Sequence, residues 1–294
     1  VPLRTGVQQG LEAKVKIGGL LGGHSGGEIH KERGNANVLL GRLLCRISGE
    51  CQVGIVAMQG GLADNAIPRE AEATLVVAEE DKDKLDSIVK KVEQELQGEL
   101  ASKDAGVFIQ AAYENVGSYE AVTAEDTKKA AAFLISLPGG VQGMSAELPG
   151  LVETSLNLGV MSCKAGTLSA EFSVRSSVES AKYALIDRLQ GLTLLAGGTN
   201  RITGDYPGWK YRKDSPLRDK MVRLYEKMYG VAPKVEAIHA GLECGILGSK
   251  IADLDCVSMG PDMTAIHTTE ETLNIPSTRR VWEYLVALLE EKEA

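Results

Sequence analysis

The chain has 294 residues, with 32 Lys and Arg against 40 Asp and Glu, a net charge of −8. An acidic chain without basic runs does not attract phosphate backbones or anionic lipid, which argues against nucleic acid and membrane surfaces as partners. No apolar run approaches the roughly 18 residues of a membrane span, and no signal segment opens the chain. The length suggests about two domains.

The first 114 residues alternate between strand and helix patterns. Residues 35–48 have the 3.6-residue apolar period of a helix, and residues 81–100 are amphipathic with an acidic first turn. The predicted elements are a strand at 11–20, a helix at 35–48, strands at 51–61 and 72–80, a helix at 81–100 and a strand at 105–114. This order is the split β-α-β-β-α-β unit of ferredoxin-like folds.

A similar order partly recurs up to residue 197. The predicted elements are a helix at 123–136, a glycine–proline loop at 136–150, a hairpin of strands at 152–163 and 166–177, and a helix at 179–197. We therefore expect an α/β (α+β) fold over residues 1–200. In it, two ferredoxin-like β-α-β-β-α-β-type halves share one sheet.

Residues 201–294 form a second predicted domain of different character. Asp214 or Ser215 caps a helix that has Pro216 at its first position. The predicted elements are a helix at 216–229, a strand at 233–241, a short helix, a strand at 255–261 and a final helix at 277–291. Two strands of parallel type are too few to make a covered sheet, so we expect this segment to be part of a domain.

The cysteines indicate a reducing environment. They are odd in number and widely spaced, at Cys45, Cys51, Cys163, Cys244 and Cys256. No CxxC pair occurs, which argues against a structural zinc site of the usual kind. A cytoplasmic location fits this cysteine usage best.

His24 stands between two Gly-Gly pairs in the stretch "GGHSGG". Glycine clusters mark tight turns, so one interpretation is a structural turn that happens to contain a histidine. In the other interpretation, the glycines let the backbone approach a ligand and present the imidazole to it. A phosphate-binding role is disfavoured because no P-loop or Rossmann spacing follows.

Six motifs occur together in a fixed order along the chain. They are "GGHSGGEIHKERGNAN", "NAIPREAEA", "VETSLNLGV", "DYPGW", "IHAGLECG" and the run from "VSMGP" to "IHTTEE". In this set the chain resembles the aminoacyl-histidine dipeptidases, which are dinuclear zinc peptidases related to carnosinase and peptidase V. The resemblance implies a lid and dimerisation-type domain at 1–200, followed by the C-terminal portion of an α/β zinc-peptidase catalytic domain at 201–294.

The resemblance implies zinc-dependent hydrolysis of dipeptides, including Xaa-His, by a zinc-activated water that attacks the peptide carbonyl. His24 matches the lid histidine that stabilises the oxyanion in this family. His267 matches a ligand of the zinc pair, although Thr268, Thr269 and Glu270 depart from the usual Ser-Pro-Asp that follows it. A homodimer in the cytoplasm is also implied.

Three further residues match substrate-binding positions of the family. Arg175 suits a bidentate pair with a dipeptide's terminal carboxylate, although a surface ion pair is the structural alternative. Asn65 resembles a lid residue that binds the same carboxylate region, although Asn is also common in turns. Gly241 matches a position where backbone contacts substrate.

Most of the family's metal site has no counterpart in the sequence. None of the four histidines stands in the H-x-D motif that supplies ligands in the family, and His267 alone cannot hold two zinc ions. We therefore expect the chain to be the C-terminal part of a dipeptidase, without its N-terminal metal-binding half and inactive alone. The alternative is a non-catalytic binding or dimerisation module derived from the lid.

Overall fold

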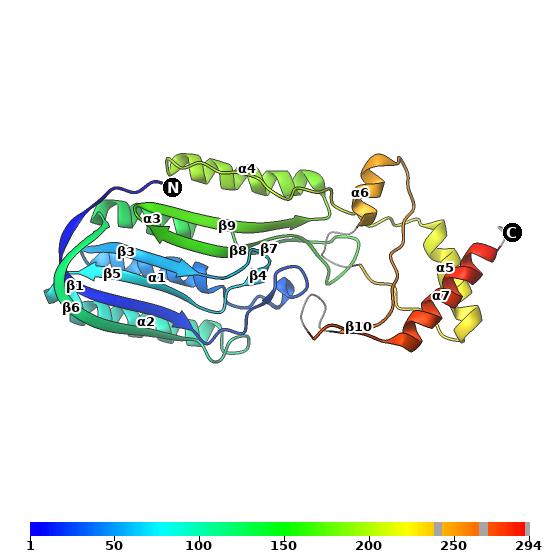
Figure 1. The fold of residues 1–294 in the computed structure, drawn as a ribbon, viewed down its shortest axis with the longest axis horizontal. Helices are drawn as coiled ribbons and strands as arrows, with labels where there is room; N and C mark the ends of the chain where they lie inside the picture. Colours follow the sequence, from blue (N-terminus) through cyan, green and yellow to red (C-terminus); the bar gives the residue numbers. More distant parts are fainter. Residues whose placement is uncertain (238–242, 265–269, 292–294) are drawn as a thin grey trace. The chain divides into compact units, whose positions relative to one another are not determined.

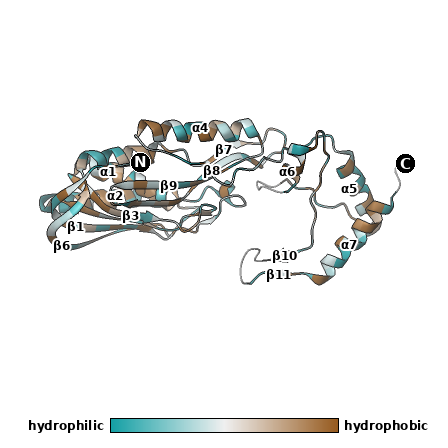
Figure 2. Cartoon of the chain, turned by 45° about the horizontal axis from the view of Figure 1, so that its top comes forward, coloured by the Kyte–Doolittle hydropathy of each residue, from teal (hydrophilic) through white to brown (hydrophobic). Residues whose placement is uncertain are grey.

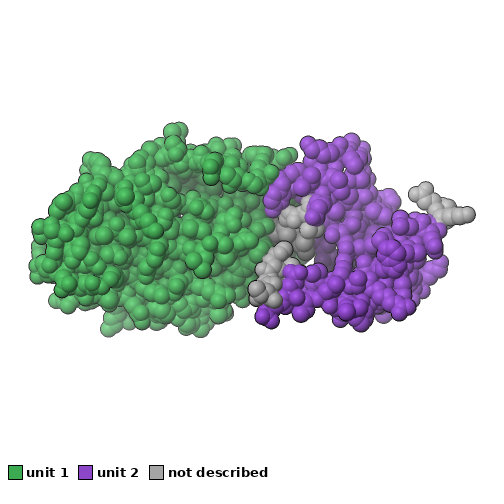
Figure 3. Space-filling view, in the orientation of Figure 1, with its two compact units in different colours: residues 1–205 green, residues 206–294 purple. Residues whose placement is uncertain are grey.

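The computed structural model describes residues 1–237, 243–264 and 270–291. The chain divides into two compact units, Val1–Asp205 and Tyr206–Ala294 (Figure 3). We call them unit 1 and unit 2. Unit 1 is an α/β unit built on one main sheet, whereas the described part of unit 2 is mainly helical.

Unit 1 alternates strands and helices as its sequence predicts. Its elements are β1 (Thr5–Gly18), β2 (Gly23–His24), η1 (Ile29–Lys31), α1 (Ala36–Glu50), β3 (Val53–Gly60), β4 (Ala66–Ile67), β5 (Ala71–Val77), η2 (Glu79–Asp81), α2 (Lys82–Glu99), β6 (Phe108–Val122), α3 (Ala124–Ser136), β7 (Gly140–Met144), β8 (Val152–Lys164), β9 (Thr167–Ser176) and α4 (Glu179–Leu195). The predicted mixed α/β fold class is confirmed, and the pairings of the main sheet are antiparallel.

The sheet contains one complete ferredoxin-like unit. Its strands lie in the order β6-β1-β5-β3-β8-β7, with β9 on the other side of β8. The first four of these, with α1 and α2, have the topology of the split β-α-β-β-α-β unit. The second half has three strands, β7, β8 and β9, rather than the four of a β-α-β-β-α-β unit, because β6 leads directly into α3. Strand β8 joins the halves by pairing with β3, where Met58 lies opposite Cys163.

Strand β7 corrects one prediction, because residues 136–150 were expected to form only a loop. Gly140 pairs with Leu156, and Met144 pairs with Val152, so β7 uses part of β8 that β3 does not reach. Glycines at 139, 140 and 143 remove the side-chain alternation that identifies a strand. The available backbone edge of β8 decides this pairing.

Helices α1, α2 and α3 cover one face of the sheet (Figure 1). In β1, Ala13, Val15 and Ile17 are fully buried while Lys14 between them is exposed, which is the alternation of a half-covered strand. The buried side chains of α2 recur every three or four residues, namely Leu85, Ile88, Val89, Val92 and Leu96. Each buried leucine contributes about 1.5–3 kcal/mol to folding.

Helix α4 lies along β9 and carries hydrophilic and hydrophobic residues along its length (Figures 1 and 2). At its C-terminal end Leu194 and Leu195 are 76% and 87% exposed. Lys182 is buried, and its Nζ lies 2.6 Å from Oδ1 of Asp205. This ion pair fixes the last residue of unit 1 to the helix.

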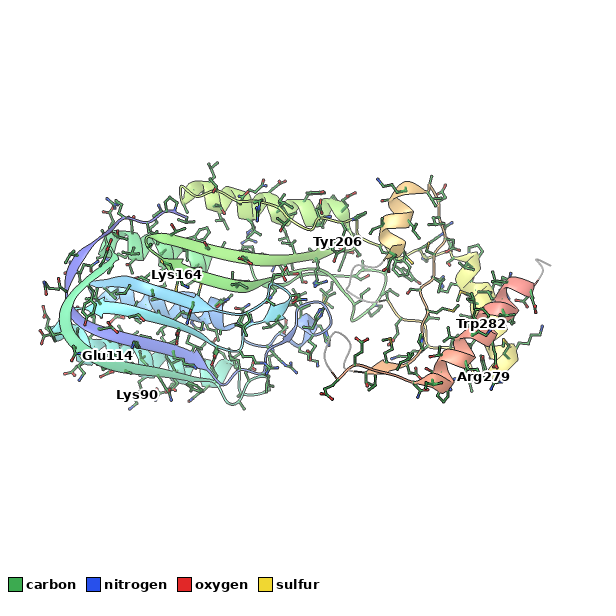
Figure 4. The ribbon with its side chains drawn as sticks, viewed as in Figure 1. Lys90, Glu114, Lys164, Tyr206, Arg279 and Trp282 are labelled. Atoms are coloured by element: carbon green, nitrogen blue, oxygen red, sulfur yellow. The ribbon has the colours of Figure 1, made fainter. Side chains whose placement is uncertain are left out.

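Unit 2 has a small core between two helices. Its described elements are α5 (Pro216–Tyr229), α6 (Glu243–Lys250), β10 (Met263–Thr264), β11 (Thr272–Leu273) and α7 (Ile275–Glu290). Met221 and Leu224 of α5 pack with Tyr284 of α7, whose hydroxyl donates to the Met221 carbonyl at 2.6 Å. On α7, Trp282 is 65% exposed (Figure 4).

The strands predicted in unit 2 are wrong wherever the structure describes them. Residues 233–237 and 255–261 form neither helix nor strand, and residues 238–241 of the first lie outside the described residues. A strand exists only through pairing with a neighbour, and neither segment has a partner among the described residues. Among all residues that the structure describes, no helix combines the length and apolarity that crossing a membrane requires.

Candidate functional site

His24 lies in a loop that connects β1 to α1. We call residues 19–34 the His24 loop. Its short strand β2 pairs with β4, so that Gly23 lies opposite Ile67 and His24 opposite Ala66. The loop ends at Asn35, whose side chain caps α1 by accepting from the N–H groups of Asn37 and Val38. The loop is therefore held between the sheet and the start of a helix.

The imidazole of His24 is oriented by its own loop. Its Nδ1 accepts hydrogen bonds from the N–H groups of Gly26 at 3.1 Å and Gly27 at 3.0 Å. A nitrogen that accepts carries no proton, so in the neutral ring the proton lies on Nε2. The side chain is exposed, and Nε2–H is its hydrogen-bond donor. The glycine-rich loop thus presents an imidazole in one tautomer.

Glu28 braces the backbone at His24. Its Oε2 accepts the His24 N–H at 3.0 Å, while its Oε1 lies 2.6 Å from Lys31 Nζ and 3.3 Å from Arg33 Nη1. The Lys31 ammonium, and after it the His24 N–H, lower the pKa of Glu28 to about 2. Gly23 has a φ of 144°, and a Cβ there would lie 2.6 Å from Glu28 Oε2. The positive φ favours a glycine beside the histidine, whereas the Glu28 carboxylate could move away from a Cβ.

Asn65 lies beside the residue that follows His24. Its carbonyl accepts the N–H of Ser25 at 2.8 Å, and its side chain is exposed. The segment around it is fixed by Asn157 of β8, a buried residue whose Nδ2 donates to the carbonyls of Asp64 at 2.9 Å and Ala66 at 2.8 Å. Asn157 therefore supports both Asn65 and, through the β2–β4 pairing, His24.

Arg175 lies on β9, close along the sheet to Asn157. It is opposite Ser155 of β8, two residues from Asn157 on the same face of that strand. Its Nε is buried and has no hydrogen-bond partner among the described residues. A buried guanidinium N–H without an acceptor is costly, and an anionic ligand would satisfy it.

Two of the expected site residues cannot be placed. Gly241 and His267 lie outside the described residues. Among the residues that are described, no group of three or more His, Cys, Asp or Glu side chains is placed to hold a metal ion. The candidate site that the structure describes therefore consists of unit 1 residues, with His24, Asn65 and Arg175 at its centre.

Local sequence does not distinguish two of the residues that support the site, Glu28 and Asn157. Glu28 follows His24 by four residues, but an acidic residue at that spacing in a loop is not distinctive. Asn157 lies inside the motif "VETSLNLGV", where a polar residue in an apolar strand was a usable signal, because buried amides need partners.

The low pKa of Glu28 predicts how the loop responds to acid. Because the folded pKa lies below the usual value of about 4.3, its stabilising contribution is complete above that pH and is lost as the pH falls toward about 2. We expect the His24 backbone N–H signal to shift in that window, because protonated Glu28 is a weaker acceptor for it, as measured by 1H–15N NMR.

The matched control for this acid response is Glu32, a loop carboxylate that pairs with Lys103 at 2.8 Å and accepts no loop N–H. Glu32→Gln should keep the acid-range shift of the His24 backbone N–H signal, whereas Glu28→Gln should remove it. An equal acid-range shift of the His24 backbone N–H signal in Glu28→Gln and in the parent would contradict the bracing role of Glu28.

The fold and this loop match proteins of known type. Residues 15–104 match the family model described as Peptidase dimerisation domain. Over 290 residues the chain is 36% identical to Cytosol non-specific dipeptidase of Escherichia coli (strain K12), covering 98% of this chain and 59% of that protein. The crystal structure of Aminoacylhistidine Dipeptidase from Vibrio alginolyticus matches with a TM-score of 0.88 at 34% identity, covering 99% of this chain and 61% of that one.

Residues 15–104 are therefore similar to a peptidase dimerisation domain. The resemblance to the aminoacyl-histidine dipeptidases is confirmed along almost the whole chain. The chain spans about three-fifths of the length of the two relatives.

Proposed function

We propose that the chain takes part in the hydrolysis of dipeptides, including Xaa-His, with His24 as the donor that stabilises the tetrahedral oxyanion. The observation that carries this proposal is the pair of N–H bonds from Gly26 and Gly27 to His24 Nδ1. They leave the proton on Nε2, where it can donate to an oxygen that becomes negative in the transition state. A donor held in place before reaction needs no reorganisation when that charge develops.

We propose that Arg175, Asn65 and Gly241 bind the substrate. The unpartnered Nε of Arg175 supports a pair with the terminal carboxylate of the dipeptide. Asn65, whose backbone is bonded to the His24 loop, would bind the same region through its exposed amide. Gly241 would contact the substrate through its backbone.

The metal of this proposal is a pair of zinc ions, of which this chain would contribute the ligand His267. The described residues do not fit such a site by themselves, because they contain no cluster of three or more ligand side chains. We therefore propose that activity needs the remaining segment that the relatives contain. We use "complete enzyme" for a protein that joins this chain to that segment.

We also propose a homodimer in the cytoplasm. The match to the Peptidase dimerisation domain supports a dimer formed through unit 1. The exposed side chains of Leu194 and Leu195 on α4 offer apolar surface for such a contact. The cytosolic name of the Escherichia coli relative and the free thiols of the described cysteines support the location.

An assay with Ala-His tests the proposed function. We expect zinc-dependent hydrolysis by the complete enzyme and none by this chain alone, because one expected ligand cannot form the metal pair. Hydrolysis by the chain alone that His267→Ala abolishes would contradict the need for the remaining segment. A complete enzyme without dipeptidase activity would favour the alternative, a non-catalytic binding or dimerisation module.

A further inference from the structure

A buried turn after α2 lies against the start of the His24 loop. Its residue Asp104 is fully buried and follows the last turn of the helix, where its N–H donates to the Leu100 carbonyl at 2.8 Å. Gly19 has a φ of 77°, and a Cβ there would lie 1.9 Å from the Gly106 carbonyl oxygen. Only glycine permits this backbone contact, which brings Asp104 to the loop.

The carboxylate of Asp104 joins the two ends of the His24 loop. Its Oδ1 accepts the N–H of Leu21 at 2.7 Å, and its Oδ2 accepts the N–H of Gly34 at 2.6 Å. The two N–H groups are 83 and 70 residues away from Asp104 in sequence. Bonds of a backbone N–H to a carboxylate are short and strong, so one side chain fixes where the loop leaves the sheet and where it meets α1.

We propose that Asp104 is a positioning residue for His24. The bonds to Nδ1 orient the imidazole within the loop, whereas Asp104 places the loop itself relative to the sheet that carries Arg175. This inference rests on the proposed role of His24. A displacement of about 1 Å at a catalytic group can lower the rate a hundredfold, so the position of the loop matters as much as the ring's orientation.

Asp104→Asn tests the proposal in the complete enzyme. The amide keeps the size of the side chain but turns one acceptor into a donor that faces a backbone N–H. We expect kcat to fall about tenfold to a hundredfold with little change in KM, since the oxyanion contact is made in the transition state. In a His24→Ala background the same substitution should cause no further loss of kcat.

Asp126→Asn is the matched control. Asp126 is also buried and accepts a distant backbone N–H, that of Arg4 at 2.6 Å, but it lies at the start of α3 and makes no bond to the loop. We expect this variant to lower the melting temperature without changing kcat. Asp104→Glu gives a second measurement if Asp104→Asn does not fold, because it keeps both oxygens but lengthens the side chain. It should also lower kcat only when His24 is present.

A spectroscopic measurement on the chain itself separates positioning from general stability. In 15N NMR spectra of the imidazole, the parent should show Nδ1 unprotonated and Nε2 protonated at His24. Asp104→Asn should keep this tautomer, because the N–H groups of Gly26 and Gly27 fix it within the loop, but it should shift the backbone N–H signals of the His24 loop. Asp126→Asn should leave both unchanged.

The outcomes distinguish the two levels of the proposal. If His24→Ala leaves kcat unchanged, the proposed function of His24 is wrong. If His24→Ala lowers kcat, two results overturn the positioning role of Asp104. One is the same effect of Asp104→Asn with and without His24, and the other is a variant in which kcat and the backbone N–H signals of the His24 loop are both unchanged.

Discussion

Replacing His24 by alanine in the complete enzyme should lower kcat about a hundredfold or more, while KM changes little. The loss of one oxyanion donor has about this effect when the donor acts mainly in the transition state. The physical reason is the fixed Nε2–H, which the N–H groups of Gly26 and Gly27 secure by binding Nδ1. Steady-state kinetics with Ala-His measure both constants.

His30→Ala is the matched control for this substitution. His30 lies in the same loop, in η1, and is also exposed, but its N–H and ring make none of the bonds that orient His24. Its removal should leave kcat within about twofold of the parent, as for surface substitutions generally. If His24→Ala kept the parental kcat, the glycine-rich loop would have a purely structural role.

Periodicity was sufficient to predict the first half of unit 1. The buried positions of α2 follow the 3.6-residue period, and around Val15 strand β1 alternates between buried aliphatic residues and more exposed lysines. In such elements each local preference agrees with the final packing. The order of strands along the sheet then follows from the known split unit.

The prediction failed where pairing rather than side-chain pattern decides the structure. Strand β7 forms because the edge of β8 near Leu156 is available to its backbone, although its own glycines give no strand signal. The opposite occurs at 255–261, where a strand-like pattern finds no partner among the described residues. Strand formation depends on a neighbour that local sequence does not reveal.

The conformation of the candidate site likewise depends partly on residues adjacent in sequence and partly on residues distant in sequence. His24 and its glycines form one continuous motif, and the contacts that orient the ring come from residues two and three positions away. Asp104 acts on the same loop across 70 and 83 residues, and no local pattern distinguishes it from any other acidic residue after a helix. Its buried position became evident only with the fold.

Arg175→Lys in the complete enzyme should raise KM for free dipeptides about tenfold and leave kcat nearly unchanged. Lysine keeps the charge but lacks the planar fork that pairs two N–H groups with a carboxylate, and it cannot replace the buried Nε–H. Such a contact binds ground state and transition state alike, so its loss appears mainly in KM. Kinetics with Ala-His and with its C-terminal amide measure the effect.

The amide substrate makes the test specific for a carboxylate. It has no terminal negative charge to pair with Arg175, so we expect it to be a poor substrate of the parent and to respond little to Arg175→Lys. Arg188→Lys is the control, because Arg188 is an exposed arginine of α4 and lies outside the His24–Asn65–Arg175 site. If the parent cleaved the amide as well as the free dipeptide, Arg175 would not be recognising a carboxylate, and its buried Nε would need another explanation.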